Sequence, residues 1–328
     1  MKIVDMHADT ISTLMNSDQH LFSNKRMIDI EKLIKGDYLL QCFAMFIVYE
    51  NKIIKDYNVF DYCNQMINKY YEEINSLSNY IKPIYTYHDI EDNIKNNIIS
   101  SMLTIEEGGV LQGKLENLDH FYNQGVRLIT LTWNYKNEIA CPNIDYFNFD
   151  FNNPVFKVND MQGLTKFGIN VVKRMNELGM IIDCSHASDK TFFDVIKYSE
   201  KPIVCSHSCS RSVCNHVRNM SDDMLLKLKE NRGVVGINYC HDFIKEDDSI
   251  ATVKDIVKHI NYIRDLIGVE YIGLGSDFDG ISNKNLQLKD ASMMPLLLDE
   301  LVSQNYSIND IDLITHQNVL RVFKENLK

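Results

Sequence analysis

Residues 163–207 read GLTKFGINVVKRMNELGMIIDCSHASDKTFFDVIKYSEKPIVCSH. The stretch opens with a helical pattern that ends at Gly179, a residue typical of helix C-termini. Two apolar runs follow, Gly179–His186 and Pro202–His207, separated by a segment that Ser188 is suited to cap as a helix. This order of strand, helix and strand predicts a βαβ unit with parallel strands. The apolar stripe of the first helix consists of Leu164, Phe167, Val171, Val172, Met175 and Leu178.

The same alternation extends over the whole chain. Most of its eight apolar runs are nearly continuous, which is typical of strands buried on both faces of a parallel sheet. Eight such units in 328 residues favour an α/β fold, a closed (β/α)8 TIM barrel, as a single domain over residues 1–328. A doubly wound open sheet is the alternative, but no GxGxxG motif follows any run. The runs are Lys2–His7, Tyr38–Ile47, Ser101–Glu106, Val126–Trp133, Gly179–His186, Pro202–His207, Gly233–Tyr239 and Tyr271–Phe278.

Helices are expected between these runs. Ser221, Asp222 and Asp223 form a capping sequence after the sixth run, and residues 252–267 and 308–327 are amphipathic. The segment Asn134–Asn159 lacks periodicity and follows the fourth run. Because loops at the carboxyl ends of barrel strands build the active site, this segment is predicted to be a lid or pocket wall.

Composition narrows the class of function. Asp plus Glu number 45 and Lys plus Arg 34, so the formal charge is −11, which argues against nucleic-acid binding. We find no signal-peptide pattern and no apolar run of about 18 residues, and we expect a cytoplasmic protein without a membrane span. The eight cysteines form no CxxC pair, so we expect reduced, mostly buried thiols. Cys205, Cys209 and Cys214 lie close in sequence, but their spacing fits no zinc pattern.

Polar side chains with metal or acid–base chemistry stand where the apolar runs end. The carboxyl ends of barrel strands meet in one ring, so we expect these side chains to converge. Three histidines with two or three carboxylates exceed the needs of one catalytic zinc, which takes three protein ligands and a water. Two metal ions about 3.5–4 Å apart would use them all. The side chains are His7, Asp9, Glu106, His186, His207 and Asp277.

Each of these residues also has an ordinary structural interpretation. Asp9 is placed to be the N-cap of a following helix, and Asp277 and Asp279 are typical turn residues. Glu107 is expected to be a solvated neighbour of Glu106, because alternation along the strand favours Glu106 as the inward residue. Pocket roles stay open for His216 and His241, which follow strands. Structural roles are expected for His20, His88, His120, His259 and His316.

The sequence resembles the membrane (renal) dipeptidase family of zinc metallopeptidases, which have amidohydrolase-like barrels. The resemblance covers nearly the whole chain, and the order of its motifs makes it specific. The steps of 21 residues from His186 to His207 and 27 residues from Glu106 to Trp133 match the family. The motifs are DMHADT (5–10), TIEEGG (104–109), GVRLITLTWN (125–134), MNELGMIIDCSHAS (175–188), IVCSHS (203–208), RNMSDDML (218–225), GLGSDFDG (273–280) and NVLRVF (318–323).

The resemblance implies a role for each matched residue. His7 and Asp9 would hold one zinc ion, His186 and His207 the other, and Glu106 would bridge them. Arg218 matches the arginine that binds the free carboxylate of the substrate, and Asp277 the acid that contacts the bridging water. Family members are often dimers, so a homodimer is possible by analogy.

One position departs from the family pattern. The family's dipeptidases usually have a substrate-binding histidine where this chain has Trp133, whose indole N–H donates but cannot replace an imidazole. Packing in the barrel mouth and lining of the substrate pocket are equally weighted interpretations of this tryptophan.

The expected reaction is hydrolysis of the amide bond of a small dipeptide. Two zinc ions would lower the pKa of a bridging water from near 16 towards about 7. Asp277 would take the proton from this water and pass it to the leaving amine. The same ligands accept other divalent metals. Alternatives are a related amidohydrolase acting on a lactone, an N-acyl amino acid or a small cyclic amide, and a metal-bearing barrel that binds a ligand without catalysis.

Overall fold

The apolar runs of the sequence form parallel strands. All eight predicted runs overlap a strand, and every residue of β4 and β7 is buried, as expected for strands covered on both faces. The computed structural model describes residues 1–49, 57–150 and 155–328. Within these ranges the strands are β1 (Ile3–Asp5), β2 (Tyr38–Phe46), β3 (Ile81–Pro83), β4 (Ile99–Glu106), β5 (Leu128–Thr130), β6 (Ile181–Asp183), β7 (Val204–Ser208), β8 (Val234–Ile237) and β9 (Ile272–Leu274).

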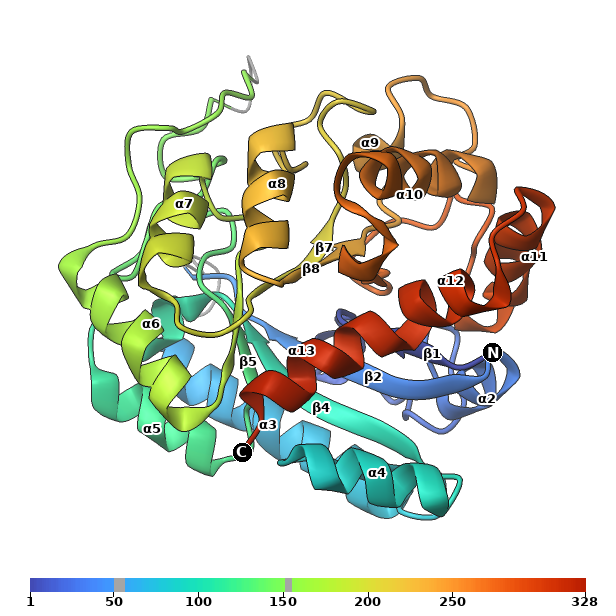
Figure 1. The fold of residues 1–328 in the computed structure, drawn as a ribbon. Coiled ribbons are helices and arrows are strands. Elements are labelled where there is room, and N and C mark those ends of the chain that lie inside the picture. The colour runs from blue at the N-terminus through green and yellow to red at the C-terminus, as the bar shows by residue number, and fades with distance from the viewer. Residues whose placement is uncertain (50–56, 151–154) are drawn as a thin grey trace.

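Strand pairing closes the sheet into a barrel. Neighbouring strands follow the order β2-β1-β9-β8-β7-β6-β5-β4, and β2 pairs in turn with β4 over seven residue pairs, the last of which joins Phe46 to Glu106. All of these pairings are parallel, and helices surround the strands (Figure 1). The predicted (β/α)8 barrel is confirmed, and the open doubly wound sheet is wrong.

Strand β3 lies outside the eight predicted runs. It pairs with the first residues of β4, where Ile81 faces Ile99, on the edge of β4 that pairs with β5 further along. Three residues that include a proline show neither a run nor an alternation, so the hydrophobic pattern does not predict this strand.

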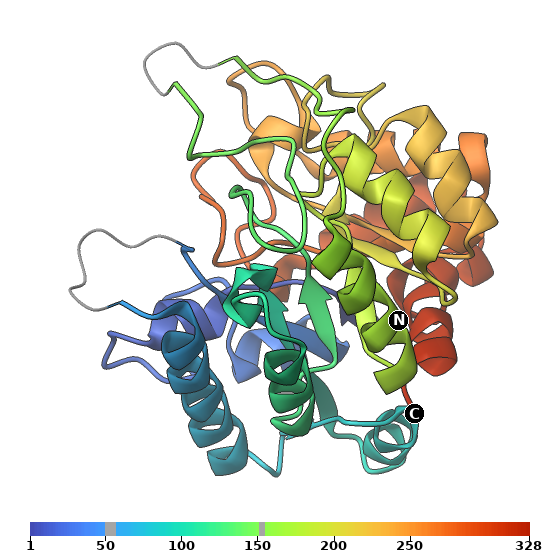
Figure 2. The same cartoon turned by 90° about the vertical axis from the view of Figure 1, so that its left-hand side faces the viewer.

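Helices connect the strands and cover the barrel on its outer side (Figure 2). The predicted caps are confirmed, because Ser188 Oγ accepts from Thr191 N, Ser221 Oγ accepts from Met224 N, and Gly179 ends its helix at a φ of 79°. In the described part of the chain the α-helices are α1 (Thr10–Leu14), α2 (Ile30–Lys35), α3 (Val59–Ser76), α4 (Tyr87–Lys95), α5 (Leu115–Asn123), α6 (Lys166–Leu178), α7 (Asp189–Tyr198), α8 (Asp222–Glu230), α9 (His241–Ile244), α10 (Val253–Ile267), α11 (Pro295–Ser303), α12 (Ile308–Asp312) and α13 (Asn318–Asn326).

The sequence pattern predicts one amphipathic helix over residues 308–327, but the structure interrupts its regular α-helical geometry. A π-helical turn, Leu313–Gln317, separates α12 from α13. Directly after this turn, Asn318 Nδ2 donates to the carbonyl oxygens of Val269 and Ile272. The wider turn therefore accompanies a side-chain contact to the start of β9, which periodicity does not reveal.

The apolar interior of the barrel lies at the amino-terminal ends of its strands. Leu128, Ile181, Val204 and Val234, the first residues of β5 to β8, share one buried cluster with residues of α13. Figure 1 shows α13 crossing this end of the barrel. Apolar side chains fill this end of the barrel. The polar side chains of a functional site are therefore expected at the carboxyl ends of the strands.

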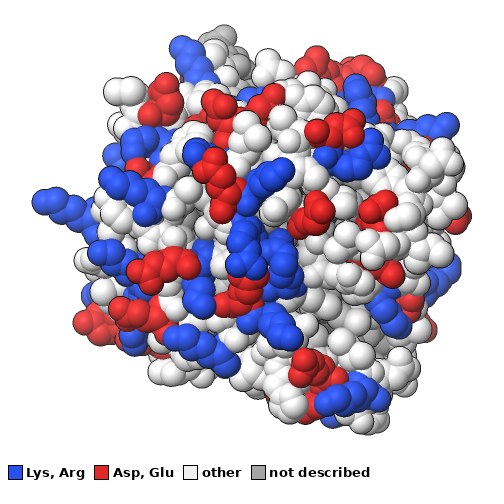
Figure 3. Space-filling model, in the orientation of Figure 1, with Lys and Arg blue, Asp and Glu red and all other residues white. Residues whose placement is uncertain are grey.

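The outer surface carries both signs of charge. On the face drawn in Figure 3, basic and acidic side chains are interspersed. No helix within the described ranges has the length and apolarity that a membrane crossing requires.

Candidate metal centre and active site

The five predicted metal ligands converge at the carboxyl end of the barrel. His7 and Asp9 follow β1, Glu106 is the last residue of β4, His186 follows β6, and His207 belongs to β7. All five side chains are at least nine-tenths buried. Four separate chain segments therefore meet at one point, as predicted from the ends of the runs.

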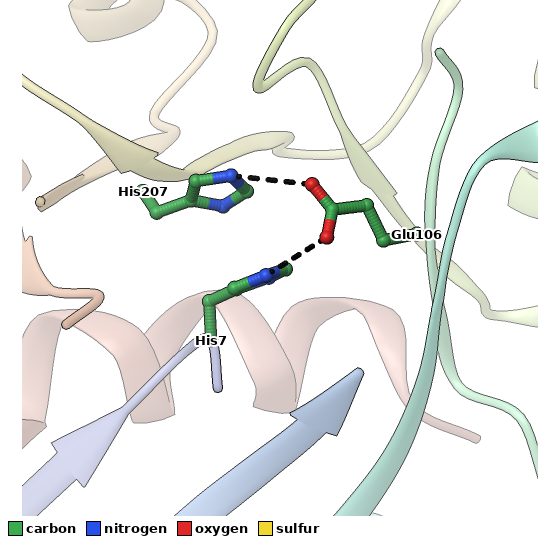
Figure 4. A group of neighbouring side chains, drawn as sticks. All are labelled: His7, Glu106 and His207. Carbon is green, nitrogen blue, oxygen red and sulfur yellow. Dashed lines mark ion pairs between the residues drawn. The ribbon is translucent and has the colours of Figure 1, made fainter. Parts of the chain in front are cut away.

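The carboxylate of Glu106 faces the histidines, and Figure 4 shows one of its oxygens directed at His7 and the other at His207. Its Oε2 lies 3.2 Å from His7 Nε2, whereas its Oε1 lies 3.0 Å from His186 Nε2 and 3.5 Å from His207 Nε2. His7 Nε2 also lies 3.5 Å from Asp9 Oδ2. The two carboxylate oxygens thus face the two pairs of ligands that the family resemblance implies.

Hydrogen bonds set the tautomers of two of these histidines. His186 Nδ1 lies 2.9 Å from Asn134 Oδ1, which only accepts, so His186 Nδ1 carries the proton. Ser206 Oγ donates to Asp183 Oδ2 at 2.6 Å and so accepts from His207 Nδ1 at 2.8 Å. Both Nε2 atoms therefore present lone pairs towards Glu106, the arrangement that metal-binding histidines need.

The unpaired atoms of the cluster also fit a cation. Among the described residues, His7 Nε2 and Asp9 Oδ1 are buried without a hydrogen-bond partner. Ligand atoms of His7, Glu106 and His207 lie within 4.8 Å of one another, and so do those of His7, Asp9 and Asp277. Imidazole nitrogens and carboxylate oxygens are donors that zinc accepts.

Electrostatics in the protein alone favour positive charge at this point. Burial opposes charge on His7, but Glu106 and Asp9 outweigh it and raise the His7 pKa well above its ordinary value. Burial, together with Arg218, lowers the pKa of His186 to about 4, so this ligand is neutral at pH 7. Glu106 and Asp9 thus favour a positive charge beside them, which the His7 proton supplies in the protein alone and which a metal cation can supply in its place.

Asp9 stands at the N-cap position of α1, but its side chain makes no capping hydrogen bond. Asp9 therefore has the N-cap position in the backbone, while its carboxylate does not cap the helix. Asp279 is different, because its Oδ2 accepts from Thr10 Oγ1 at 2.7 Å and its Oδ1 from Met27 N at 2.7 Å. Asp279 therefore has a structural role, because it links Thr10 and Met27 through hydrogen bonds, whereas Asp9 and Asp277 face the cluster.

Asp277 lies beside the cluster, with Oδ1 4.0 Å from His7 Nε2. Its Oδ2 accepts from Asn238 Nδ2 at 2.9 Å, which orients the carboxylate. The backbone is left-handed here, with a φ of 63°, as it is at His186, with a φ of 66°. Uncommon φ values of this kind are typical of functional sites, where surrounding contacts hold them. Burial raises the pKa of Asp277 to about 6.

Arg218 lies in the connection after β7 and is 5% exposed. Its Nη2 donates to the carbonyl oxygen of His207 at 3.2 Å, and its Cζ lies 5.2 Å from the centre of the Phe243 ring. Its Nε is buried and has no hydrogen-bond partner in the described part of the chain. A buried guanidinium with a spare donor is suited to bind an anion.

Trp133 both packs in the barrel mouth and lines a cavity there. The cavity, about 520 Å³, is bounded by Trp133 and Phe46 as well as by Asp9, Glu106 and Asp277. The ring centroids of Phe46 and Tyr146 lie 4.8 and 5.2 Å from that of Trp133, both edge-on. The two equally weighted interpretations of this residue therefore describe the same position.

The prediction that Glu107 is solvated is wrong. Its side chain is fully buried, and it accepts hydrogen bonds from Gly109 N at 2.7 Å, Trp133 N at 3.0 Å and Asn137 Nδ2 at 2.5 Å. Its φ of 102° departs from regular strand geometry, so alternation does not apply to it. Burial raises the pKa of Glu107 to about 7.

Sequence reasoning missed the residues that orient the ligands. Asn134 holds His186, Asn238 holds Asp277, and Ser206 together with Asp183 holds His207. Their position in the sequence could have indicated this role, because each of these residues lies at or just after the end of a strand. Asn134 begins the predicted loop 134–159, which contributes this residue to the cavity wall, while its residues 151–154 lie outside the described ranges.

The other metal candidates do not form a site. Sγ of Cys209 and of Cys214 donates to the carbonyl oxygens of Asn238 and Asp242, respectively. Within the described ranges, the groups of possible metal ligands include no cysteine. His216 stacks on Phe243, with 4.7 Å between ring centroids, and His241 begins α9; neither lines the cavity.

Comparison with known proteins places this geometry in a family. The family model for membrane dipeptidase (peptidase family M19) matches residues 1–328. The chain is 34% identical over 227 residues to Dipeptidase 3 of Homo sapiens, covering 69% of this chain and 45% of that protein. It is 33% identical over 301 residues to Dipeptidase aclJ of Aspergillus oryzae, covering 90% and 69%. The chain thus spans less than half the length of Dipeptidase 3.

Solved structures support the same fold. A metallo peptidase from Rhodobacter sphaeroides, liganded with a phosphinate mimic of the dipeptide L-Ala-D-Ala, has a TM-score of 0.88 at 21% identity and covers 99% of each chain. A metallo peptidase named dipeptidase AC also has a TM-score of 0.88, at 22% identity. These likenesses confirm the barrel. With the family model matching its whole length, the chain belongs to the membrane dipeptidase family, peptidase family M19.

Proposed function

We propose that this protein is a dipeptidase that depends on two divalent metal ions, with zinc as the expected metal. The observation that carries the proposal is the position of Glu106, whose two oxygens face His7 on one side and His186 with His207 on the other. A carboxylate in this position can bridge two cations. His7 and Asp9 would hold one ion, and His186 and His207 the other.

When bound, the metal pair would lower the pKa of a water molecule and polarise the scissile carbonyl group. The remaining tasks belong to side chains of this chain. Asp277, held through Oδ2 by Asn238, has Oδ1 directed at the cluster, where it would accept the proton of the attacking water. It would then pass this proton to the departing amine.

Arg218 would bind the terminal carboxylate of the substrate and so set the register of the scissile bond. Its buried guanidinium and its spare Nε–H support this role. A charge-assisted hydrogen bond formed away from water is strong enough to distinguish a free carboxylate from an amide.

Hydrolysis of a dipeptide panel by the zinc-loaded protein tests the proposal. The panel holds L,L- and L,D-dipeptides, and a parallel series after chelation measures the dependence on metal. We expect hydrolysis that is lost on chelation and returns with zinc. The absence of any dipeptide cleavage by protein with full metal content would reject the function.

Trp133, at the position of the family's usual histidine, is the observation that favours a second candidate. This is hydrolysis of a lactone, an N-acyl amino acid or another small amide at the same centre. A panel of these compounds, assayed beside the dipeptides, distinguishes the two functions through the ratio of their kcat/KM values.

A further inference from the structure

The cavity above the cluster has one wall without charge. Phe46 ends β2, Val48 follows it, and Trp133 follows β5; these three residues are called the apolar wall below. The rings of Phe46 and Trp133 meet edge-on, with centroids 4.8 Å apart. Phe46 and Trp133 therefore form one apolar surface at the mouth of the barrel, and Val48 lines the same cavity.

The apolar wall is held in place before any ligand binds. Phe46 N donates to Ser12 Oγ at 2.9 Å, and Trp133 N donates to the buried carboxylate of Glu107 at 3.0 Å. Fixed backbone on both sides reduces the entropy lost when a ligand packs against these side chains.

Ser12, Thr13 and Asp279, which line the cavity outside the cluster, already make hydrogen bonds. Ser12 Oγ donates to the carbonyl oxygen of Ala44, Thr13 Oγ1 donates to that of Thr10, and both oxygens of Asp279 accept hydrogen bonds. The other charged side chains among the described residues that line the cavity are Asp9, Glu106 and Asp277, together with the ligand His186. No described lysine or arginine lines the cavity, and the one lining carboxylate outside the cluster, Asp279, already accepts two hydrogen bonds.

Barrel topology places the β2 part of the wall, Phe46 and Val48, opposite the strand that precedes Arg218, whereas Trp133 follows β5, two positions from β7. In the strand order β2-β1-β9-β8-β7-β6-β5-β4, the strands β2 and β7 lie four positions apart in either direction. Phe46 ends β2, whereas Arg218 follows β7. A dipeptide with its terminal carboxylate at Arg218 therefore extends its N-terminal residue across the metal cluster towards the apolar wall.

We infer that the substrates are dipeptides whose N-terminal side chain is apolar, of the size of leucine or phenylalanine, and that Phe46, Val48 and Trp133 select it. The inference rests on the proposed function for the direction of the substrate. A charged side chain at this wall would lose its hydration without gaining a partner, and discrimination on that basis is large.

Binding of inert analogues tests the inference without turnover. Zinc-loaded protein is titrated calorimetrically with phosphinate dipeptide analogues that share an alanine-like C-terminal half and carry a leucine-like, glutamate-like or lysine-like N-terminal side chain. We expect the leucine-like analogue to bind at least about tenfold more tightly than the charged ones. Equal dissociation constants, or tighter binding of a charged analogue, would overturn the inference.

Fluorescence locates the bound side chain, because Trp133 is the only tryptophan of the chain. Binding of the leucine-like analogue is expected to change the Trp133 emission with the dissociation constant found by calorimetry. Calorimetric binding without any change in emission would place the side chain elsewhere and contradict the assignment of the wall.

A charge introduced at the wall should reverse the preference. Val48→Arg is expected to raise affinity for the glutamate-like analogue relative to the leucine-like one at least about tenfold. Val302→Arg, at an exposed position of α11, is the matched control and should keep the wild-type ratio. An unchanged ratio in correctly folded Val48→Arg protein would contradict the inference.

Cleavage separates this inference from the proposed function. Hydrolysis of Leu-Ala, Glu-Ala and Lys-Ala at similar kcat/KM, with similar affinities of the analogues, rejects the apolar selection and keeps the dipeptidase. A protein that prefers the leucine-like analogue and cleaves no dipeptide rejects the dipeptidase and keeps the selection.

Discussion

Nε2 of His186 lies 3.1 Å from Nε2 of His207, and both atoms carry a lone pair, because each histidine donates from Nδ1. Two lone pairs at this distance repel unless a cation lies between them or beside them. The two nitrogens are therefore suited to bind a cation.

Purified protein is expected to hold about two equivalents of zinc or a similar divalent ion, measured by plasma mass spectrometry. His186→Ala should lower this content and abolish hydrolysis, because one ion loses a ligand whose tautomer Asn134 sets. His88→Ala, at an exposed position of α4, is the matched control. Full metal content in His186→Ala protein would exclude this histidine from the centre.

Asp277→Asn is expected to lower kcat by about 10²–10⁴-fold, because the amide cannot accept the proton that the carboxylate takes. Its position beside Asn238 allows a hydrogen bond to persist, so metal content should hold. Asp223→Asn, on the exposed side of α8, is the control. Near wild-type kcat in Asp277→Asn protein would remove Asp277 from the reaction.

Arg218→Gln is expected to raise KM for dipeptides with a free C-terminal carboxylate by about 10- to 100-fold, from the loss of a charge-assisted hydrogen bond. Dipeptides with an amidated C-terminus have no charge for Arg218 to bind, so their KM should change far less. Steady-state kinetics on both series measure the difference, and equal changes would reject the assigned role.

Substitutions of Glu107 test how its buried hydrogen bonds and its strained backbone contribute to stability. Glu107→Ala leaves Gly109 N and Trp133 N without the acceptor that Glu107 provides, and we expect a loss of about 1–3 kcal/mol per buried group in the free energy of unfolding. Glu107→Gly should destabilise less than Glu107→Ala, because glycine adopts a φ of 102° without strain. Urea unfolding compares the two, and the opposite order would show that backbone strain is negligible here.

His259 is predicted to make stability depend on pH. Burial lowers the pKa of His259 to about 4, and its Nδ1 accepts from Ser210 N at 3.1 Å, which requires the neutral ring. The unfolded chain binds this proton near pH 6.5, so stability is complete above that pH and falls as the pH drops towards 4. Between pH 7 and 5 the expected loss is on the order of 2 kcal/mol.

Substitution isolates this contribution. His259→Leu should flatten the fall in unfolding free energy between pH 6.5 and 4, whatever its effect at pH 7. Ile263→Val, at a buried position of the same helix α10, should lower stability by about 1 kcal/mol at all pH values and keep the slope. An unchanged slope in His259→Leu protein would assign the acid sensitivity to other groups.

The barrel and the polar cluster at its mouth could be predicted because both depend on local patterns. Continuous apolar runs such as 101–106 indicate buried parallel strands, and a polar residue at the end of a run must lie at the mouth of the barrel. Glu106, His186 and His207 were found in this way, and the family motifs added Arg218 and Trp133.

What the pattern missed depends on contacts between distant segments. Glu107 is buried because Trp133 N and Asn137 donate to it, and Asn238 faces Asp277 because β8 and β9 are neighbours in the barrel. The π-turn before Asn318 accompanies contacts of that side chain with two carbonyl groups near β9. Strand register and side-chain packing determine such contacts, and neither can be read from the periodicity of a single sequence.

During synthesis, the barrel can close only after its last strand, β9, has been made. The side chains of the cluster reach from residue 7 to residue 277, so at about 5–20 residues per second roughly 15–50 s separate the emergence of its first and last members. His7 and Asp9 leave the ribosome first, yet β1 lies between β2 and β9, and β9 is made last of the strands. High-affinity metal binding is therefore expected only after β9 has joined the barrel, and translation intermediates stalled before β9 should not retain a metal ion.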